Sequence, residues 1–214
     1  MQTKQKIIFC AADFEVSDVL RLHNYKKERS EPFEVWNNGK TRLVITGIGL
    51  APAALAFAWA CGEYDFDEAV NIGTCGASAA VECVLEPFDQ NDAIHAIREF
   101  PSAKLPRVVF ASAYEISEVC SIEPYSDLRF KLSDTGRTLA TSSRPVSSAK
   151  RRALAGAKGE LVDMEGYAFA FAAKVFGKKL SMIKLVSDFS EECNINENIK
   201  SLQKRLAHVE GVFS

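Results

Sequence analysis

The segment LVDMEGYAFAFAAKVF, residues 161–176, is a strongly apolar run with two carboxylates, Asp163 and Glu165, near its start. A few residues later, MIKLVSD (182–188) has the pattern of a buried strand that ends in a third carboxylate, Asp188. Carboxylates are costly to remove from water, so acids at the start of a buried helix and at the end of a buried strand suggest a functional role. The two segments together predict a helix that leads into a core strand.

Segments with the pattern of strands and segments with the pattern of helices alternate along the rest of the chain. Apolar runs predict strands at residues 6–11, 41–46, 69–72, 108–111 and 138–141, and helical spacing predicts helices at 13–25, 51–61, 147–155 and 194–209. The Asn37-Asn38-Gly39 turn predicts a hairpin between residues 33–36 and 41–46. Residues 86–106 are polar, contain prolines and show no clear pattern. Alternating strands and helices indicate a single α/β sandwich over residues 1–214 with a largely parallel central sheet.

Composition narrows the classes of partner. A net charge of −2 gives no reason to expect nucleic acid or an anionic membrane as partner. The six cysteines form no CxxC pair and have no histidine at a metal-ligand spacing, so we expect reduced thiols, no metal and no cofactor. The apolar part of the N-terminus is too short for a signal sequence, and no run approaches the ~20 residues of a membrane span. We therefore expect a cytoplasmic protein.

The candidate site residues each have a structural alternative. The glycines at residues 47–49 and 73–76 would let backbone approach a ligand, or would simply form turns at strand ends. Glu165 could hold two sugar hydroxyls or could complement the helix dipole, and Asp163 is expected to cap that helix. Asp188 could share a proton with a heterocycle nitrogen or cap the following turn. From its position alone, Glu15 is expected to be an exposed partner of the dipole of the helix predicted at 13–25.

Five segments, in this order, resemble the nucleoside phosphorylase / 5′-methylthioadenosine–S-adenosylhomocysteine nucleosidase family. They are IIFCAADFEV (7–16), ITGIGLAPAA (45–54), NIGTCGA (71–77), VDMEGYA (162–168) and IKLVSD (183–188). The resemblance implies a three-layer α/β sandwich with a central mixed, largely parallel sheet. It also implies a homodimer that binds a small-molecule nucleoside.

The resemblance assigns roles to matching residues. Glu15 matches the acid that activates the attacking water, and Asp188, supported by Ser187, matches the acid that protonates N7 of the purine. Met164 and Glu165 match the pair that binds the ribose, with Glu165 on the 2′- and 3′-hydroxyls. Thr74 and Gly76 lie in the glycine-rich segment near the ribose. These roles imply a purine nucleosidase that hydrolyses the N-glycosidic bond of an adenine nucleoside such as 5′-methylthioadenosine or S-adenosylhomocysteine.

The chain departs from the family pattern in the segment that reads the base. Residues 141–145 are TSSRP and lack the acid and the aromatic residue usual there, and Lys184 replaces the usual arginine. Arg144 could serve a phosphate, so a purine nucleoside phosphorylase is an alternative. A nucleoside-binding protein without catalysis is a second alternative, because the acids remain while the base-reading segment has changed.

Overall fold

A computed structural model describes residues 6–77, 110–118, 129–146, 148–188, 199, 203, 206–207, 209 and 211–213. The strands are β1 (Lys6–Cys10), β2 (Lys26–Arg29), β3 (Glu34–Asn37), β4 (Thr41–Ile45), β5 (Glu68–Ala77), β6 (Phe110–Glu118), β7 (Phe130–Lys131), β8 (Arg137–Thr141), β9 (Leu161–Asp163) and β10 (Lys179–Asp188). The helices are α1 (Asp13–Leu22), α2 (Leu50–Glu63), α4 (Ala149–Gly156) and α5 (Gly166–Phe176).

The strands form one mixed sheet, as expected. Parallel pairing joins β4, β1, β5 and β10 at its centre, and antiparallel pairing adds β3 and β2 at one edge. Beyond β5 the sheet curls back on itself. Strand β10 pairs with β6, β6 with β8, β8 with β9, and β9 again with β5, which closes a ring of strands. The sequence pattern predicted the layers but not this closure, which depends on long-range pairing.

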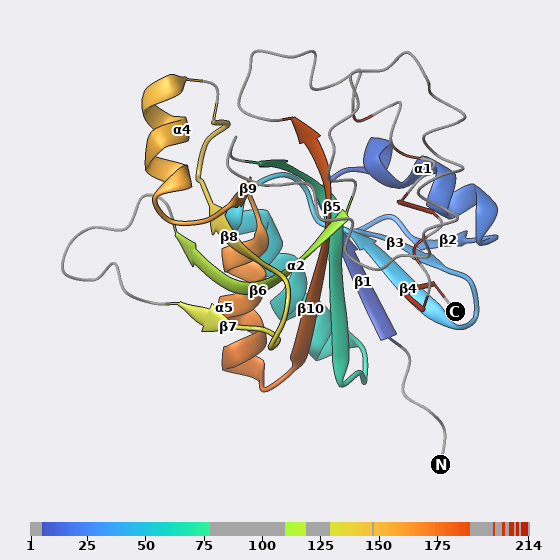
Figure 1. The fold of residues 1–214 in the computed structure, drawn as a ribbon. Coiled ribbons are helices and arrows are strands. Elements are labelled where there is room, and N and C mark those ends of the chain that lie inside the picture. The colour runs from blue at the N-terminus through green and yellow to red at the C-terminus, as the bar shows by residue number, and fades with distance from the viewer. Residues whose placement is uncertain are drawn as a thin grey trace.

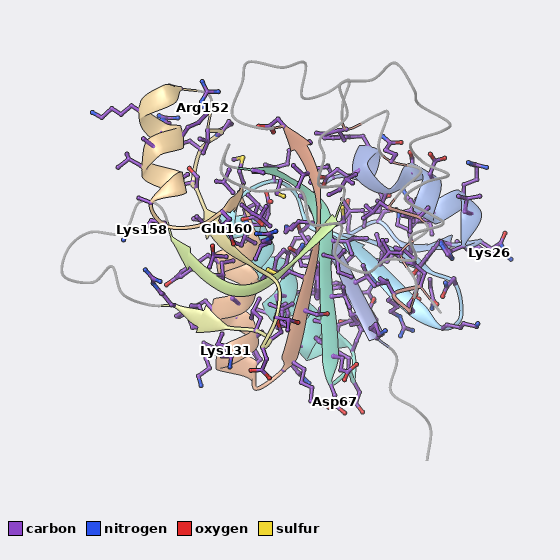
Figure 2. All side chains as sticks on the ribbon, in the orientation of Figure 1. Lys26, Asp67, Lys131, Arg152, Lys158 and Glu160 are labelled. Carbon is purple, nitrogen blue, oxygen red and sulfur yellow. The ribbon has the colours of Figure 1, made fainter. Side chains whose placement is uncertain are left out.

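Alternation along β1 explains why helices cover both faces of the sheet. Ile7 and Phe9 pack into a cluster with α2 and α5, whereas Ile8 and Cys10 pack into a second cluster with α1. Figure 1 shows α2 and α5 together behind the sheet and α1 apart from them. Charged side chains such as Lys26, Asp67 and Lys131 project from the periphery (Figure 2) and are exposed.

Most predicted elements that fall on described residues are confirmed within a few positions, including the hairpin formed by β3 and β4. Two expectations are wrong. Residues 73–76 are not a loop, because β5 continues to Ala77 with its backbone paired to β10 and β9. Residues 161–163 form strand β9 rather than the start of a helix, since they pair with β8 and β5.

Some expectations lie outside the described residues. Residues 86–106 are among these, as is most of the helix expected at 194–209, where Ile199, Gln203 and Leu206 have helical backbone. In the described part of the chain, no helix has the length and apolar character needed to cross a bilayer. The cytoplasmic location stays a prediction.

Candidate active site

One cavity of about 720 Å³ gathers all seven residues predicted to form the site. Its lining includes Glu15, Thr74, Gly76, Met164, Glu165, Ser187 and Asp188. They come from α1, β5, the β9–α5 junction and the end of β10, segments that lie far apart in the sequence. The volume is in the range of sites for small organic molecules. Asp188 is the last residue of β10, whose arrowhead marks this end of the sheet in Figure 1.

Glu15 is buried in the first turn of α1. Its Oε1 accepts hydrogen bonds from the backbone N–H of Thr74 (2.8 Å) and from the Thr74 hydroxyl (2.7 Å). Its Oε2 lies 3.3 Å from the Cys10 thiol. The alternative of an exposed dipole partner is therefore wrong. The approach of Thr74 is possible because β5 stays extended past Gly73, and the glycine backbone faces the carboxylate without a side chain between them.

Glu165 sits immediately before α5 and makes no side-chain capping bond to it. Its Oε1 instead accepts a hydrogen bond of 2.7 Å from the backbone N–H of Gly49. Gly49 immediately precedes α2 as its N-cap and has a φ of 105°, in the left-handed region that favours glycine. The glycine-containing segment at residues 47–49 therefore holds the carboxylate of Glu165 in place. Burial and the nearby Asp163 raise the pKa of Glu165 to about 7, although Lys184 and the Gly49 N–H act in the opposite direction.

Asp188 is placed by an irregularity in β10. Along the parallel pairing with β5, Val186 lies opposite Cys75 and Asp188 opposite Gly76, so β10 advances two residues while β5 advances one. Such bulges re-aim side chains and are common beside active sites. The Ser187 hydroxyl lies 3.1 Å from Asp188 Oδ2 and 3.2 Å from the Cys75 carbonyl. The alternative that Asp188 caps a following turn concerns residues outside the described ranges.

Asp163 and Lys184 form a buried ion pair that the sequence reasoning missed. Lys184 Nζ lies 2.7 Å from Asp163 Oδ2, and the two side chains are 2% and 1% exposed. Burial alone would lower the pKa of Lys184, but Asp163 and Glu165 outweigh it and raise that pKa, so the ammonium stays charged. A lysine inside the apolar strand at residues 182–188 was the available signal, because a buried charge needs a partner.

The prediction that Asp163 caps a helix is incomplete. Its Oδ2 does accept a hydrogen bond of 2.9 Å from the N–H of Gly166, the first residue of α5. Its Oδ1 accepts one of 2.7 Å from the Thr141 hydroxyl, which in turn accepts from the N–H of Tyr167. Asp163 therefore joins β8, β10 and the start of α5.

The cavity wall formed by residues 144–146 carries a positively charged side chain. Arg144, Pro145 and Val146 line the cavity, and among the described residues of the lining Arg144 is the one basic residue beside four acids. Ser142 fixes this turn, since its hydroxyl donates to the Arg144 carbonyl (2.7 Å) and accepts from the Arg144 N–H (3.4 Å). Among the residues that the structure describes, no three potential metal ligands come together.

The fold and the site together define a class of protein, and comparison with known families names it. The sequence profile of the phosphorylase superfamily matches residues 5–213, and the chain belongs to that superfamily. No curated protein matches the chain in sequence.

Solved structures share the fold at low sequence identity. A 5′-methylthioadenosine/S-adenosylhomocysteine nucleosidase from Neisseria meningitidis, in complex with methylthio-immucillin-A, is 18% identical, with a TM-score of 0.72 and 96% of each chain covered. The 5′-methylthioadenosine nucleosidase of Arabidopsis thaliana is 15% identical, with a TM-score of 0.73, 96% of this chain and 93% of that chain covered. A futalosine hydrolase from Helicobacter pylori is 12% identical, with a TM-score of 0.73, 97% of this chain and 96% of that chain covered.

Proposed function

We propose that this protein is a nucleosidase that hydrolyses the N-glycosidic bond of a purine nucleoside, most specifically an adenine nucleoside such as 5′-methylthioadenosine or S-adenosylhomocysteine. The observation that carries the proposal is the convergence of three carboxyl groups, from Glu15, Glu165 and Asp188, on one cavity. Each comes from a different part of the chain and has its own supporting contacts.

The chemistry divides among these acids. Glu165 accepts hydrogen bonds from the vicinal hydroxyls of the ribose, beside Met164. Glu15 takes a proton from a water molecule as the water oxygen attacks the anomeric carbon. The N-glycosidic bond breaks through an oxocarbenium-like state, and Asp188 donates a proton to the departing base. Thr74 and Ser187 hold the two catalytic carboxyls, and Gly76 leaves room for Asp188.

The charge of the cavity favours water over phosphate as the nucleophile. Asp163 is neutralised by Lys184, which leaves the carboxyl groups of Glu15, Glu165 and Asp188 in a cavity that Arg144 also lines. An anionic nucleophile would be repelled by the ionised forms of these acids. The presence of Arg144 nevertheless keeps a purine nucleoside phosphorylase as the second candidate, because an arginine on the wall could bind phosphate.

A single assay panel tests the proposal. Base release is measured from 5′-methylthioadenosine, S-adenosylhomocysteine, adenosine, inosine and futalosine, with and without phosphate. We expect release of adenine and free sugar without phosphate. Strict dependence on phosphate with formation of a sugar 1-phosphate would establish the phosphorylase instead. Binding of a nucleoside without any base release, in the wild-type protein, would establish a non-catalytic binding protein.

We also propose that the protein is a homodimer. Large apolar side chains are exposed on the outer sides of two neighbouring helices: Leu55 of α2, and Phe171, Val175 and Phe176 of α5. Apolar surface of this kind is typical of interaction sites when it is contiguous.

A further inference from the structure

Cys10 is the last residue of β1, and its side chain is fully buried beside the candidate water-activating acid. Its sulfur lies 3.3 Å from Glu15 Oε2 and 3.5 Å from the Ala12 carbonyl oxygen. The backbone of Cys10 is held as well, because its carbonyl accepts a hydrogen bond of 2.9 Å from the N–H of Thr46. The thiol therefore has a fixed position against one oxygen of the carboxylate.

The two oxygens of Glu15 have different surroundings. A carboxylate offers about two acceptor positions on each oxygen. Both positions of Oε1 are filled, by the N–H and the hydroxyl of Thr74. Oε2 has the Cys10 thiol as its neighbour, so among the residues that the structure describes one position on Oε2 is left to accept a proton from a ligand in the cavity.

The thiol stays protonated and can therefore act as a donor. Burial, followed by the negative charge of Glu15, raises the pKa of Cys10 well above its usual value, while Lys184 acts in the opposite direction. Of the two acceptors within reach, Glu15 is the charged one, and a hydrogen bond to a charged acceptor is the stronger. A thiol is nevertheless a weaker donor than a hydroxyl, so it orients the carboxylate while withdrawing little charge from it.

We propose that Cys10 is a positioning residue for Glu15: its thiol donates to Oε2, fixes the plane of the carboxylate and leaves Oε2 basic enough to accept a proton. The proposal rests on the proposed function, in which that proton comes from the attacking water. The other described charged groups that line this cavity or act on the pair are Asp163, Glu165, Asp188, Arg144 and Lys184, and they stay the same in Cys10 variants.

The test compares Cys10→Ala with Cys10→Ser. Loss of the donor in Cys10→Ala should move the acidic limb of the pH profile of kcat upward by about half a pH unit. The kcat profile is used because it reports the substrate-bound enzyme, in which the ribose hydroxyls hold Glu165 ionised. Cys10→Ser keeps a donor and should return the limb to the wild-type position or below it. Cys61→Ala and Cys61→Ser, at a half-buried thiol of α2, serve as matched controls and should leave the limb in place. An unmoved limb in Cys10→Ala, or an equal upward shift in both Cys10 variants, would overturn the proposal.

A second measurement decides the proposal without turnover. The carboxyl band of protonated Glu15 is assigned by infrared difference against Glu15→Gln and titrated in the wild type and both Cys10 variants. We expect the titration midpoint of Glu15 to be higher in Cys10→Ala than in the wild type. In Cys10→Ser it should lie at the wild-type midpoint or below it. Identical midpoints in all three proteins would refute the role of Cys10 even in an active enzyme. Ordered midpoints in a protein that releases no base would instead refute the nucleosidase function and leave the contact between Cys10 and Glu15 established.

Discussion

Glu165 is a buried carboxyl group that changes its charge near neutral pH. Because its pKa is raised from 4.5 to about 7 by burial and by Asp163, the folded protein binds a proton at Glu165 more readily than the unfolded chain does. Its contribution to stability is therefore full below pH 4.5 and is lost as the pH rises through about 7. The ribose hydroxyls, however, need the ionised form as acceptor.

Stability favours the protonated form of Glu165, whereas ribose binding needs the ionised form. This opposition gives a prediction for Glu165→Gln. The neutral amide removes the desolvation of the anion, so Tm at pH 8 should rise above that of the wild type, by an amount that corresponds to at most roughly 3 kcal/mol. The difference should vanish near pH 4.5. KM should increase by roughly 10-fold to 100-fold, because charge-assisted hydrogen bonds to the substrate are lost. Thermal denaturation across pH and steady-state kinetics check both effects, and a variant that is less stable at pH 8 would contradict the first.

Asp188 has a different task, which predicts a different kinetic signature. Its proton matters mainly when the base departs, so Asp188→Asn should lower kcat by roughly 10²-fold to 10⁴-fold with little change in KM. The Ser187 hydroxyl remains available to hold the amide in place. Steady-state kinetics with the best substrate of the panel measure the two constants. Equal losses in binding and turnover would argue against the role of general acid.

At the scale of elements, the bulge at the end of β10 and the glycine opposite it form one unit. A Cβ added at Gly76 would lie 3.1 Å from Asp188 Oδ1 and 3.2 Å from Val162. We expect Gly76→Ala to displace the carboxyl group and to lower kcat by about 10-fold or more, since small misplacements of a catalytic group are costly. Gly156→Ala, in α4 where a Cβ meets open space, is the matched control and should leave kcat unchanged. Wild-type kcat in Gly76→Ala would show that the fit is not tight.

The ion pair between Asp163 and Lys184 ties β9 to β10 from within the core. Lys184→Met would leave Asp163 buried without its partner and should lower the free energy of unfolding by about 3–5 kcal/mol. The double variant Asp163→Asn/Lys184→Met should recover part of the loss. Lys179, the first residue of the same strand, offers a matched control. It pairs with Glu68 at 3.8 Å, both side chains are exposed, and Lys179→Met should change stability by less than about 1 kcal/mol. Denaturant unfolding measures all three, and equal losses in the two single variants would contradict the argument.

The ring of strands explains how much of the site could be predicted. Local patterns sufficed for strands such as β8 and for the hairpin of β3 and β4, because alternation and turn residues act over short distances. They failed at residues 73–76, where glycines suggested a turn but pairing with β10 and β9 keeps the backbone extended. The partner of Lys184 could not be identified for the same reason, since Asp163 reaches it only through the closure of the ring. The roles of the candidate acids were assigned through family resemblance, whereas their contacts depend on this long-range geometry.

At the scale of the whole molecule, α2 and α5 pack on each other and carry apolar side chains on their outer sides. Leu55 is 64% exposed and Val175 is 63% exposed, so both would gain from burial against a second copy of the chain. We expect light scattering coupled to size-exclusion chromatography to give the mass of a dimer for the wild type. Leu55→Glu/Val175→Glu should give a monomer, because two charges would have to be desolvated in the interface.

The control for this experiment places the same charge elsewhere on the surface. Leu154 of α4 is 53% exposed and lies on a different helix, so Leu154→Glu should remain dimeric. Circular dichroism establishes that each variant is folded before its mass is interpreted. A folded wild-type protein that elutes as a monomer over a wide range of concentration would refute the homodimer. A dimer that persists in Leu55→Glu/Val175→Glu would instead place the interface on another surface, since two buried glutamates could not be accommodated between these helices.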